Sequence, residues 1–156
     1  MHRFFVAAGL VIATVCGSAD QGKQSIVPGE SHNKHAAHLM KCAEECNICQ
    51  RACDSCAAHC AHMMTHGKKE HHTTLQTCLD CATHCSAAAT IMARQGPFSD
   101  LICKACLDAC ARCGKECEKH PSDQQMKQCA EACRRCEKAC RDMLVHMNGA
   151  NLERGK

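Results

Sequence analysis

The sequence has few of the side chains that usually fill the core of a small globular protein. Its 156 residues include no tryptophan, no tyrosine and only three phenylalanines. Large apolar side chains are scarce after the N-terminal segment, so an ordinary hydrophobic core cannot form. The chain is nonetheless long enough for one compact domain, whose core must therefore be built from another kind of side chain.

Two further absences bear on the partners of the protein. The formal net charge is only +3 and no basic run is interleaved with aromatic residues, so nucleic acid is not an expected partner. The one long apolar run, residues 4–15, is shorter than the ~20 residues of a membrane-spanning helix. We therefore expect no membrane contact unless Cys16, which follows this run, carries a lipid.

Residues 1–19 have the pattern of a secretory signal peptide. Arg3 gives a basic start, the apolar run follows, and Ala19 ends a stretch of small residues before Asp20. No twin arginine is present, which favours the general export route. We expect an exported, periplasmic protein that loses Cys16 on cleavage, and a lipid anchor on Cys16 is the alternative.

Cysteine is the most informative residue type, since it occurs 19 times alongside 12 histidines and 8 methionines. After a flexible leader predicted over 20–30, the stretch 42–60 carries cysteines at steps of four, three, four, three and four. This is the period at which an α-helix presents one buried stripe. We predict a helix that Ser31 caps and Gly67 ends, with cysteine at every core-facing position of the stripe.

Three more helices with the same cysteine spacing are predicted. The Gly96-Pro97 pair stops the second, Ser99 caps the third, and Ser122 with Gln125 forms a capping box for the fourth. The expected segments are a helix over 74–95 after a polar turn at 68–73, a helix over 99–120, a helix over 122–149 and a C-terminal tail over 150–156. Short turns make neighbouring helices antiparallel, so residues 31–149 predict an all-α, up-down-up-down four-helix bundle with a cysteine-lined core.

The cysteine stripes of all four helices are expected to face one axis. The residues concerned are Cys42, Cys46, Cys49, Cys53, Cys56, Cys60, Cys78, Cys81, Cys85, Cys103, Cys106, Cys110, Cys113, Cys117, Cys129, Cys133, Cys136 and Cys140. Thiols that only pack as small hydrophobes would leave the core underfilled, because each is smaller than leucine. The array therefore indicates a chemical use of sulfur.

Disulfides and zinc fit the spacing less well than copper does. Residues three or four apart on a helix have Cβ atoms ~5–6 Å apart, whereas a disulfide requires ~3.5–4.5 Å. Structural zinc requires four ligands, and the sequence does not divide its thiols into quartets. The familiar iron–sulfur spacings are absent. A disulfide-stapled bundle, a metallothionein-like zinc protein and a thiol redox buffer remain as alternatives.

Copper(I) is the metal that the pattern favours. Soft thiolate and thioether ligands select Cu(I), and two thiolates four apart on one helix, such as Cys49 and Cys53, can complete a site. Monovalent ions also neutralise buried thiolates, which cannot stay charged without compensation. We expect storage of roughly one Cu(I) per cysteine if the thiolates bridge, and about half that without bridging. No activated nucleophile stands out, so we do not expect an enzyme.

Roughly residues 35–145 resemble the four-helix-bundle copper storage proteins. The motifs that carry the resemblance are Cys56-x-x-His59-Cys60-x-x-Met63 and Cys113-x-x-x-Cys117-x-x-x-Pro121-Ser122, the latter leading into the last cysteine stripe. The resemblance implies a bundle that binds many Cu(I) ions, mainly through cysteine pairs four apart, and that assembles as a homo-oligomer. The family has an exported and a cytosolic branch, and the signal peptide indicates the exported one. A copper donor or acceptor protein is the expected partner.

One end of the predicted bundle gathers histidine and methionine. His59, Met63, His120 and Met126 are candidate ligands of a copper entrance, because imidazole and thioether are neutral, exchangeable copper ligands. The resemblance also implies such a mouth, and His59 and Met63 match its motif. Nearby residues that fit a polar loop equally well are His62, His66, His71 and His72.

The opposite end offers a second, less defined set of candidates. His35 and His38 extend the first stripe backwards, and Met143 extends the last stripe forwards. For the methionines at this end we expect a hydrophobic closure of the bundle. A separate Cu(II) or zinc site that combines His32 with His35 and His38 is an alternative for the histidines.

Overall fold

The computed structural model describes residues 29–154 and the side chains of residues 34–149. The elements are α1 (Gly29–Thr65), the short 3-10 helix η1 (Lys69–His71), α2 (His72–Ala93), α3 (Ser99–Cys117) and α4 (Gln124–Arg154). No strand occurs in this part of the chain, so the predicted all-α class is confirmed. The predicted signal peptide and leader residues 20–28 lie outside the described residues.

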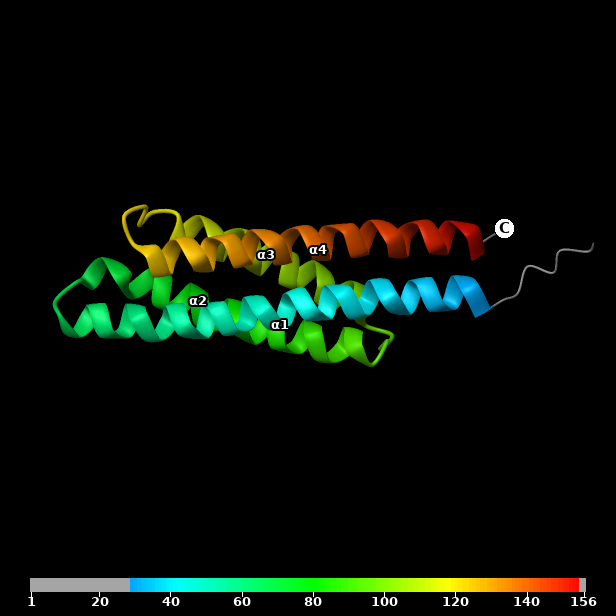
Figure 1. Ribbon diagram of the computed structural model, residues 1–156, viewed down its shortest axis with the longest axis horizontal. Coiled ribbons are helices and arrows are strands. Elements are labelled where there is room, and N and C mark those ends of the chain that lie inside the picture. The colour runs from blue at the N-terminus through cyan, green and yellow to red at the C-terminus, as the bar shows by residue number, and fades with distance from the viewer. Residues whose placement is uncertain (1–28, 155–156) are drawn as a thin grey trace, which may run out of the picture.

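The helices form an antiparallel bundle in which each helix packs against its neighbours in chain order. α1 contacts α2 and α4, and α3 contacts the same two helices. Figure 1 shows that α1 and α4 run on together past the turn between α2 and α3. We call this the terminal end, and the end that carries η1 and residues 118–123 the mouth end. The predicted up-down-up-down bundle is confirmed.

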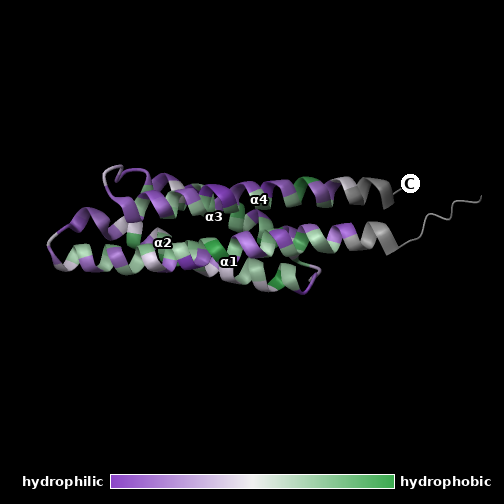
Figure 2. Ribbon diagram, in the orientation of Figure 1, coloured by the Kyte–Doolittle hydropathy of each residue, from purple (hydrophilic) through white to green (hydrophobic). Residues whose placement is uncertain are grey.

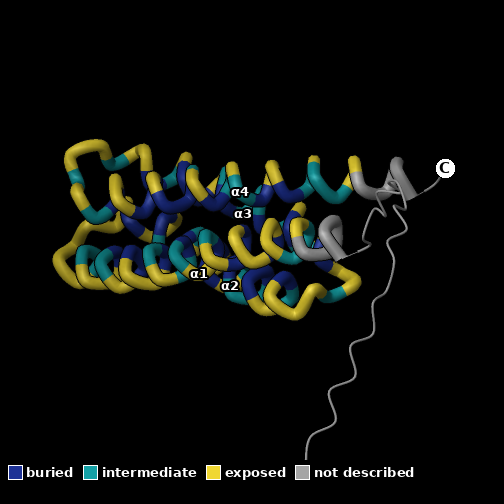
Figure 3. Tube along the Cα trace, turned by 45° about the vertical axis from the view of Figure 1, so that its right-hand side comes forward, coloured by how far each residue is buried: buried dark blue, intermediate teal, exposed yellow. Residues whose placement is uncertain are grey.

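The axis of the bundle is lined by sulfur. All 18 cysteines of the described residues are at most 2% exposed, and buried positions follow the inner side of each helix in Figure 3. Hydrophobic and hydrophilic residues alternate along every helix, as expected for helices with one buried face (Figure 2). The prediction that every cysteine stripe faces inward is therefore confirmed.

Large apolar side chains are buried mainly at the terminal end. Leu39, Met92 and Met143 are at most 2% exposed there, whereas Met126 is fully buried near the mouth end. Their position supports the predicted hydrophobic closure beyond the last cysteines. Within the described residues, none of the helices combines the length and apolar character that crossing a bilayer requires.

Two helices end in the same hydrogen-bonded turn. After α1, Gly67 has φ +79°, its N–H donates to the Met64 carbonyl at 3.0 Å, and the Lys68 N–H donates to the Met63 carbonyl at 3.2 Å. This pattern satisfies the last free carbonyls of a helix and requires a left-handed residue, for which glycine is best suited. The predicted stop at Gly67 is confirmed. After α2 the left-handed residue is Gln95, at φ 53°.

The predicted caps of α3 and α4 are wrong. Ser99 is the first residue of α3, and its hydroxyl donates to the Gly96 carbonyl at 2.7 Å instead of accepting from the helix. The cap of α4 is Asp123, not Ser122: its Oδ1 accepts from the backbone N–H groups of Gln125 at 2.9 Å and Met126 at 3.2 Å. Aspartate and serine are comparable N-caps, so two adjacent candidates could not be separated by residue type.

The outer ends of α1 and α4 also differ from the prediction. α1 begins at Gly29, so Ser31 lies within the helix and does not cap it. α4 continues to Arg154, past the predicted end at Gly149. A single glycine inside a helix costs only ~1 kcal/mol, which the surrounding helix can offset.

Candidate metal centre

The cysteine sulfurs form one continuous array along the axis. Neighbouring sulfurs are in contact at 3.6 Å between Cys85 and Cys110, for example, and at 4.0 Å between Cys53 and Cys113. Backbones of the diagonal helices α1 and α3 do not touch, yet Cys46 and Cys106 meet at 3.8 Å. Cysteine is small enough to let four helices converge while its sulfur still reaches the axis.

Most sulfur contacts join different helices. Of the predicted pairs four apart, Cys49 with Cys53 at 3.9 Å and Cys106 with Cys110 at 4.0 Å are in contact. The sulfurs of two further pairs, Cys129 with Cys133 and Cys136 with Cys140, lie within 4.8 Å of each other. The array therefore combines the predicted pairs with cross-helix neighbours that the spacing within a single helix cannot reveal.

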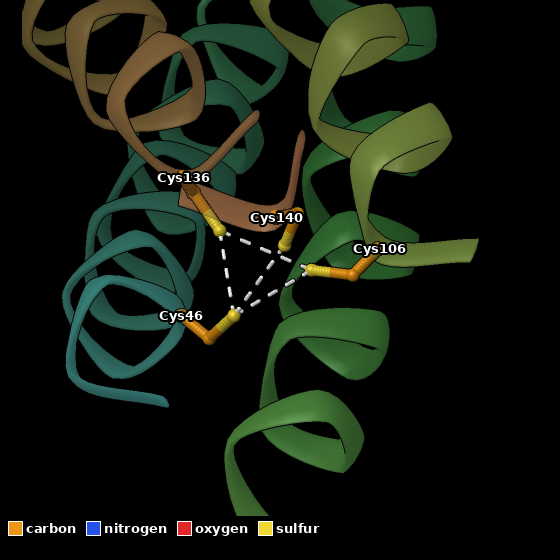
Figure 4. A group of neighbouring side chains, drawn as sticks. All are labelled: Cys46, Cys106, Cys136 and Cys140. Atoms are coloured by element: carbon orange, nitrogen blue, oxygen red, sulfur yellow. Dashed lines mark hydrogen bonds between the residues drawn. The ribbon is translucent and has the colours of Figure 1, made fainter. Parts of the chain in front are cut away.

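Figure 4 shows how one group of sulfurs converges. Cys46 lies 3.6 Å from Cys136, 3.8 Å from Cys106 and 3.9 Å from Cys140, so α1, α3 and α4 all contribute ligand atoms. Further groups whose sulfurs lie within 4.8 Å of one another are Cys49/Cys53/Cys81/Cys133, Cys49/Cys85/Cys110/Cys136, Cys53/Cys113/Cys129/Cys133 and Cys56/Cys78/Cys117/Cys129. Several cysteines belong to two groups, so a metal ion in one group shares ligands with the next.

The sulfurs of the described residues are free thiols. Their separations far exceed the ~2.05 Å of a disulfide bond. Burial, and then the adjacent Cys56, raises the pKa of the Cys60 thiol to about 12. Hydrogen bonds with Cys113 and other neighbours, and then burial, also raise the pKa of Cys53. At neutral pH such thiols stay protonated until a metal ion displaces the proton.

Three histidines from different elements meet at the mouth end. The rings of His71 and His120 are stacked with centroids 4.5 Å apart, and His59 meets His71 edge to face at 6.3 Å. His71 is only 4% exposed and its Nδ1 has no hydrogen-bond partner among the described residues. Burial, and then His120, lowers the pKa of His71, so its ring is neutral and able to bind a metal at neutral pH.

Polar neighbours fix the other two rings of this cluster. The Asp123 Oδ2 lies 2.7 Å from Nε2 of His59, and the Thr74 hydroxyl lies 3.2 Å from Nε2 of His120. Burial would raise the pKa of Asp123, but hydrogen bonds from His59 and from the backbone amides of α4 bring it below its usual value. A carboxylate on one ring nitrogen orients the other nitrogen of a metal-binding histidine.

The thioethers connect the histidines to the thiols. The thiol of Cys56 donates to Sδ of the fully buried Met126 at 3.3 Å, and Met63 is half-buried on the last turns of α1. Cys117 and His120 line one surface pocket of about 520 Å³. The four residues predicted for the mouth thus lie at the same end of the bundle, where Met126 touches Cys56 and His120 shares a pocket with Cys117.

The structure also separates candidates that the sequence left equivalent. His71 is buried in the cluster, whereas His62, His66 and His72 are exposed. Asp123 was missed, although the N-cap preference of aspartate was a signal that could have identified it. The burial of His71 depends on η1, which lies within the predicted polar turn at 68–73 but whose 3-10 conformation the residue types there do not specify.

Comparison with known proteins agrees with this geometry. Residues 34–145 match the copper storage protein family, Csp. The chain is 37% identical over 84 residues to YhjQ, an uncharacterized cysteine-rich protein of Bacillus subtilis (strain 168), a match that covers 53% of this chain and 74% of that protein.

Solved structures give the same result. A cytosolic copper storage protein from Streptomyces lividans with five coppers shares 33% identity at a TM-score of 0.67, over 72% of this chain and 97% of that one. The Cu(I)-bound copper storage protein BsCsp3 shares 32% identity at a TM-score of 0.62, over 69% of this chain and 98% of that one. The family match spans nearly all of the cysteine-lined bundle, and this protein is therefore a member of the copper storage protein family.

Proposed function

We propose that the bundle stores Cu(I) at high capacity on its buried thiolates. The observation that carries the proposal is the continuity of the array: 18 buried free thiols whose groups share members from one end of the axis to the other. Each Cu(I) that displaces one proton leaves the core neutral, and thiolate is the ligand that this ion prefers. The relatives from Streptomyces lividans and BsCsp3 have copper bound in their solved structures.

The proposed division of labour follows from ligand chemistry. The 18 cysteines retain copper, while His59, Met63, His120 and Met126 pass it between solvent and the thiolates. His71 joins this set because it is buried against His120 with an unpartnered ring nitrogen. Neutral imidazole and thioether bind copper less strongly than thiolate does, which suits transfer. The role is binding and release, with no catalytic step.

The decisive experiment is a titration of the reduced protein with Cu(I) against a competing chelator, without oxygen. We expect saturation at roughly one Cu(I) per cysteine, or about half that without bridging. Replacing Cys49 and Cys53 by serine should lower the capacity by about one to two ions and leave the bundle folded. Saturation of the native protein at only a few ions would contradict storage.

Zinc is the competing candidate that a specific observation favours. Three of the groups share no cysteine, so tetrahedral ions could occupy them together: Cys46/Cys106/Cys136/Cys140, Cys49/Cys53/Cys81/Cys133 and Cys56/Cys78/Cys117/Cys129. Zinc with four thiolates each would saturate the protein at roughly a quarter of the cysteine count, which separates the two metals by stoichiometry. Retention of zinc against an equivalent of Cu(I) per thiol would favour the zinc function.

We propose further that the protein is exported, is a homo-oligomer and exchanges copper with a donor or acceptor protein. Export is supported by the sequence pattern of residues 1–19. Mass measurement of the protein from a cell fraction tests export, since cleavage would leave Asp20 at the N-terminus and a lipid on Cys16 would add mass.

Self-association is supported by exposed apolar side chains, including Phe98, Leu101 and Val145. Sedimentation of the purified protein tests self-association.

A further inference from the structure

Three histidines at the terminal end lie in mutual contact, far from the mouth. The ring of His146 on α4 stacks on His38 with centroids 4.3 Å apart and on His35 with centroids 5.3 Å apart. The two histidines of α1 are three residues apart, so they share one face of the helix. His146 contacts both of them from α4, and α4 lies beside α1 in the bundle (Figure 1).

The nitrogen atoms of this cluster are partly enclosed. The Nε2 atom of His146 is buried and accepts or donates no hydrogen bond among the described residues. A polar atom removed from water without a partner is costly, and coordination to a cation satisfies an imidazole nitrogen. Stacking between imidazole rings is a weak contact, and it leaves the buried Nε2 atom of His146 without a partner among the described residues.

Pockets give an ion access to the cluster. His38 borders a pocket of about 130 Å³, whose lining includes Asp142 and Met143. His35 borders a second pocket beside the turn between α2 and α3. The Asp142 carboxylate now pairs with Lys138 at 2.6 Å in an exposed ion pair. Exchange of this pair for the ion, together with water and rotation of the rings from their stacked arrangement, would complete a coordination sphere.

We propose that His35, His38 and His146 form a binding site for one divalent ion of the zinc and Cu(II) class. Three imidazoles with an open fourth position are an established ligand set for such ions. Thiolates select Cu(I) and imidazoles suit zinc, copper and nickel, so the two donor sets of this protein differ in selectivity. The site goes beyond Cu(I) storage and requires no copper in the array.

The test uses Zn(II), which undergoes no redox reaction with thiols, and protein whose thiols have first been saturated with Cu(I). Bound zinc is measured by competition with a fluorescent zinc chelator in the native protein and in His146→Ala. We expect about one additional zinc ion in the native protein and an affinity at least ~100-fold lower in the variant, since loss of a ligand should cost no less than loss of a residue that supports one. The matched control is His84→Ala, which removes a histidine from the middle of α2.

The readout is the difference between proteins that have the same thiols, so it remains interpretable if copper storage itself fails. Ring ¹⁵N spectra of the Cu(I)-loaded protein provide a second readout, because both Cu(I) and Zn(II) are diamagnetic. One equivalent of zinc should shift the resonances of three histidines, and these shifts should be absent in His146→Ala. Equal zinc binding in the native protein and in His146→Ala, or equal loss in His84→Ala, would overturn the proposal.

Discussion

The two ends of the bundle contain the same residue types in different relations to sulfur. At the mouth end, Met126 touches Cys56, and His120 lines a pocket of about 520 Å³ together with Cys117. At the terminal end, the pocket that joins His38 to Cys42 is about 130 Å³. The presence of histidine and methionine therefore does not define the function of an end. Their contacts with the thiols, and the pockets they share with them, do.

The supporting contacts differ as well. At the mouth, Asp123 and Thr74 hold two of the rings by hydrogen bonds, so these ring nitrogens have fixed directions. At the terminal end, the ring of His146 stacks on the rings of His35 and His38. Buried Leu39, Met92 and Met143 lie at that end. The first arrangement suits transfer to the thiolates, and the second suits closure of the array with a separate site outside it.

The largest expected effect concerns the apolar closure. Replacing Met143 by alanine should lower the free energy of unfolding of the metal-free protein by about 2–5 kcal/mol, because a buried side chain is lost. Chemical denaturation measures this change. The control is Met40→Ala, which affects a side chain that is 51% exposed and should change stability by less than about 0.5 kcal/mol. Equal effects would show that the terminal end is not a packed closure.

The next effect concerns the rate of copper loading. The double variant His59→Ala with Met63→Leu should load Cu(I) about ten- to hundredfold more slowly, with little change in capacity, because ligands of the entrance are lost. Stopped-flow transfer from a coloured Cu(I) chelator measures the rate. The matched variant at the other end is His38→Ala with Met143→Leu, for which we expect the native rate. Equal slowing in both would mean that copper enters at both ends.

A smaller effect concerns the residue that joins α1 to α4 at the mouth. Replacing Asp123 by alanine should cost about 1 kcal/mol of unfolding free energy through loss of the helix cap. Asparagine is as good an N-cap as aspartate, so Asp123→Asn should keep most of this contribution. Ser122→Ala provides the contrast, since its hydroxyl is not the cap and its loss should be within error. A larger loss in Ser122→Ala than in Asp123→Ala would reject the assignment.

The smallest expected effect concerns how the stability of the metal-free protein depends on pH through the mouth-end thiol of Cys60. Its pKa in the folded protein, about 12, lies above the ordinary value of 9.0. The protonated thiol therefore stabilises the metal-free fold fully below pH 9, and this contribution is lost as the pH rises from 9 to 12. Denaturation curves across this range should show the decline in the native protein and a smaller one in Cys60→Ser. Identical profiles would contradict the assignment.

The sequence predicted the bundle because the cysteine spacing is itself the helical period. Each stripe specifies which face of its helix is buried, and Gly67 and Gly96 mark the ends of the first two. The partners across the axis could not be predicted in this way. Contact between Cys46 and Cys106 depends on the relative height of two helices, which the turn geometry determines.

The candidate metal centre was likewise predicted in part. The mouth-end cluster followed from the order of the helices, but the separation of buried His71 from its exposed neighbour His72 depends on one short 3-10 turn. No pattern in the sequence indicates His146, which follows the last cysteine of α4. Its contact with His38 depends on the packing of α1 against α4, the first and last helices in the chain.

The sharing of cysteines between groups has a consequence for the order in which copper moves. An ion that exchanges one thiolate for the next can travel along the axis without returning to solvent. The wider of the two pockets lies at the mouth end, so copper enters and leaves the array from that side. The ion that enters last is then the first to leave. Copper bound around Cys42 and Cys103 would then be the reserve that turns over most slowly, and copper beside Cys56 the fraction first available to an acceptor.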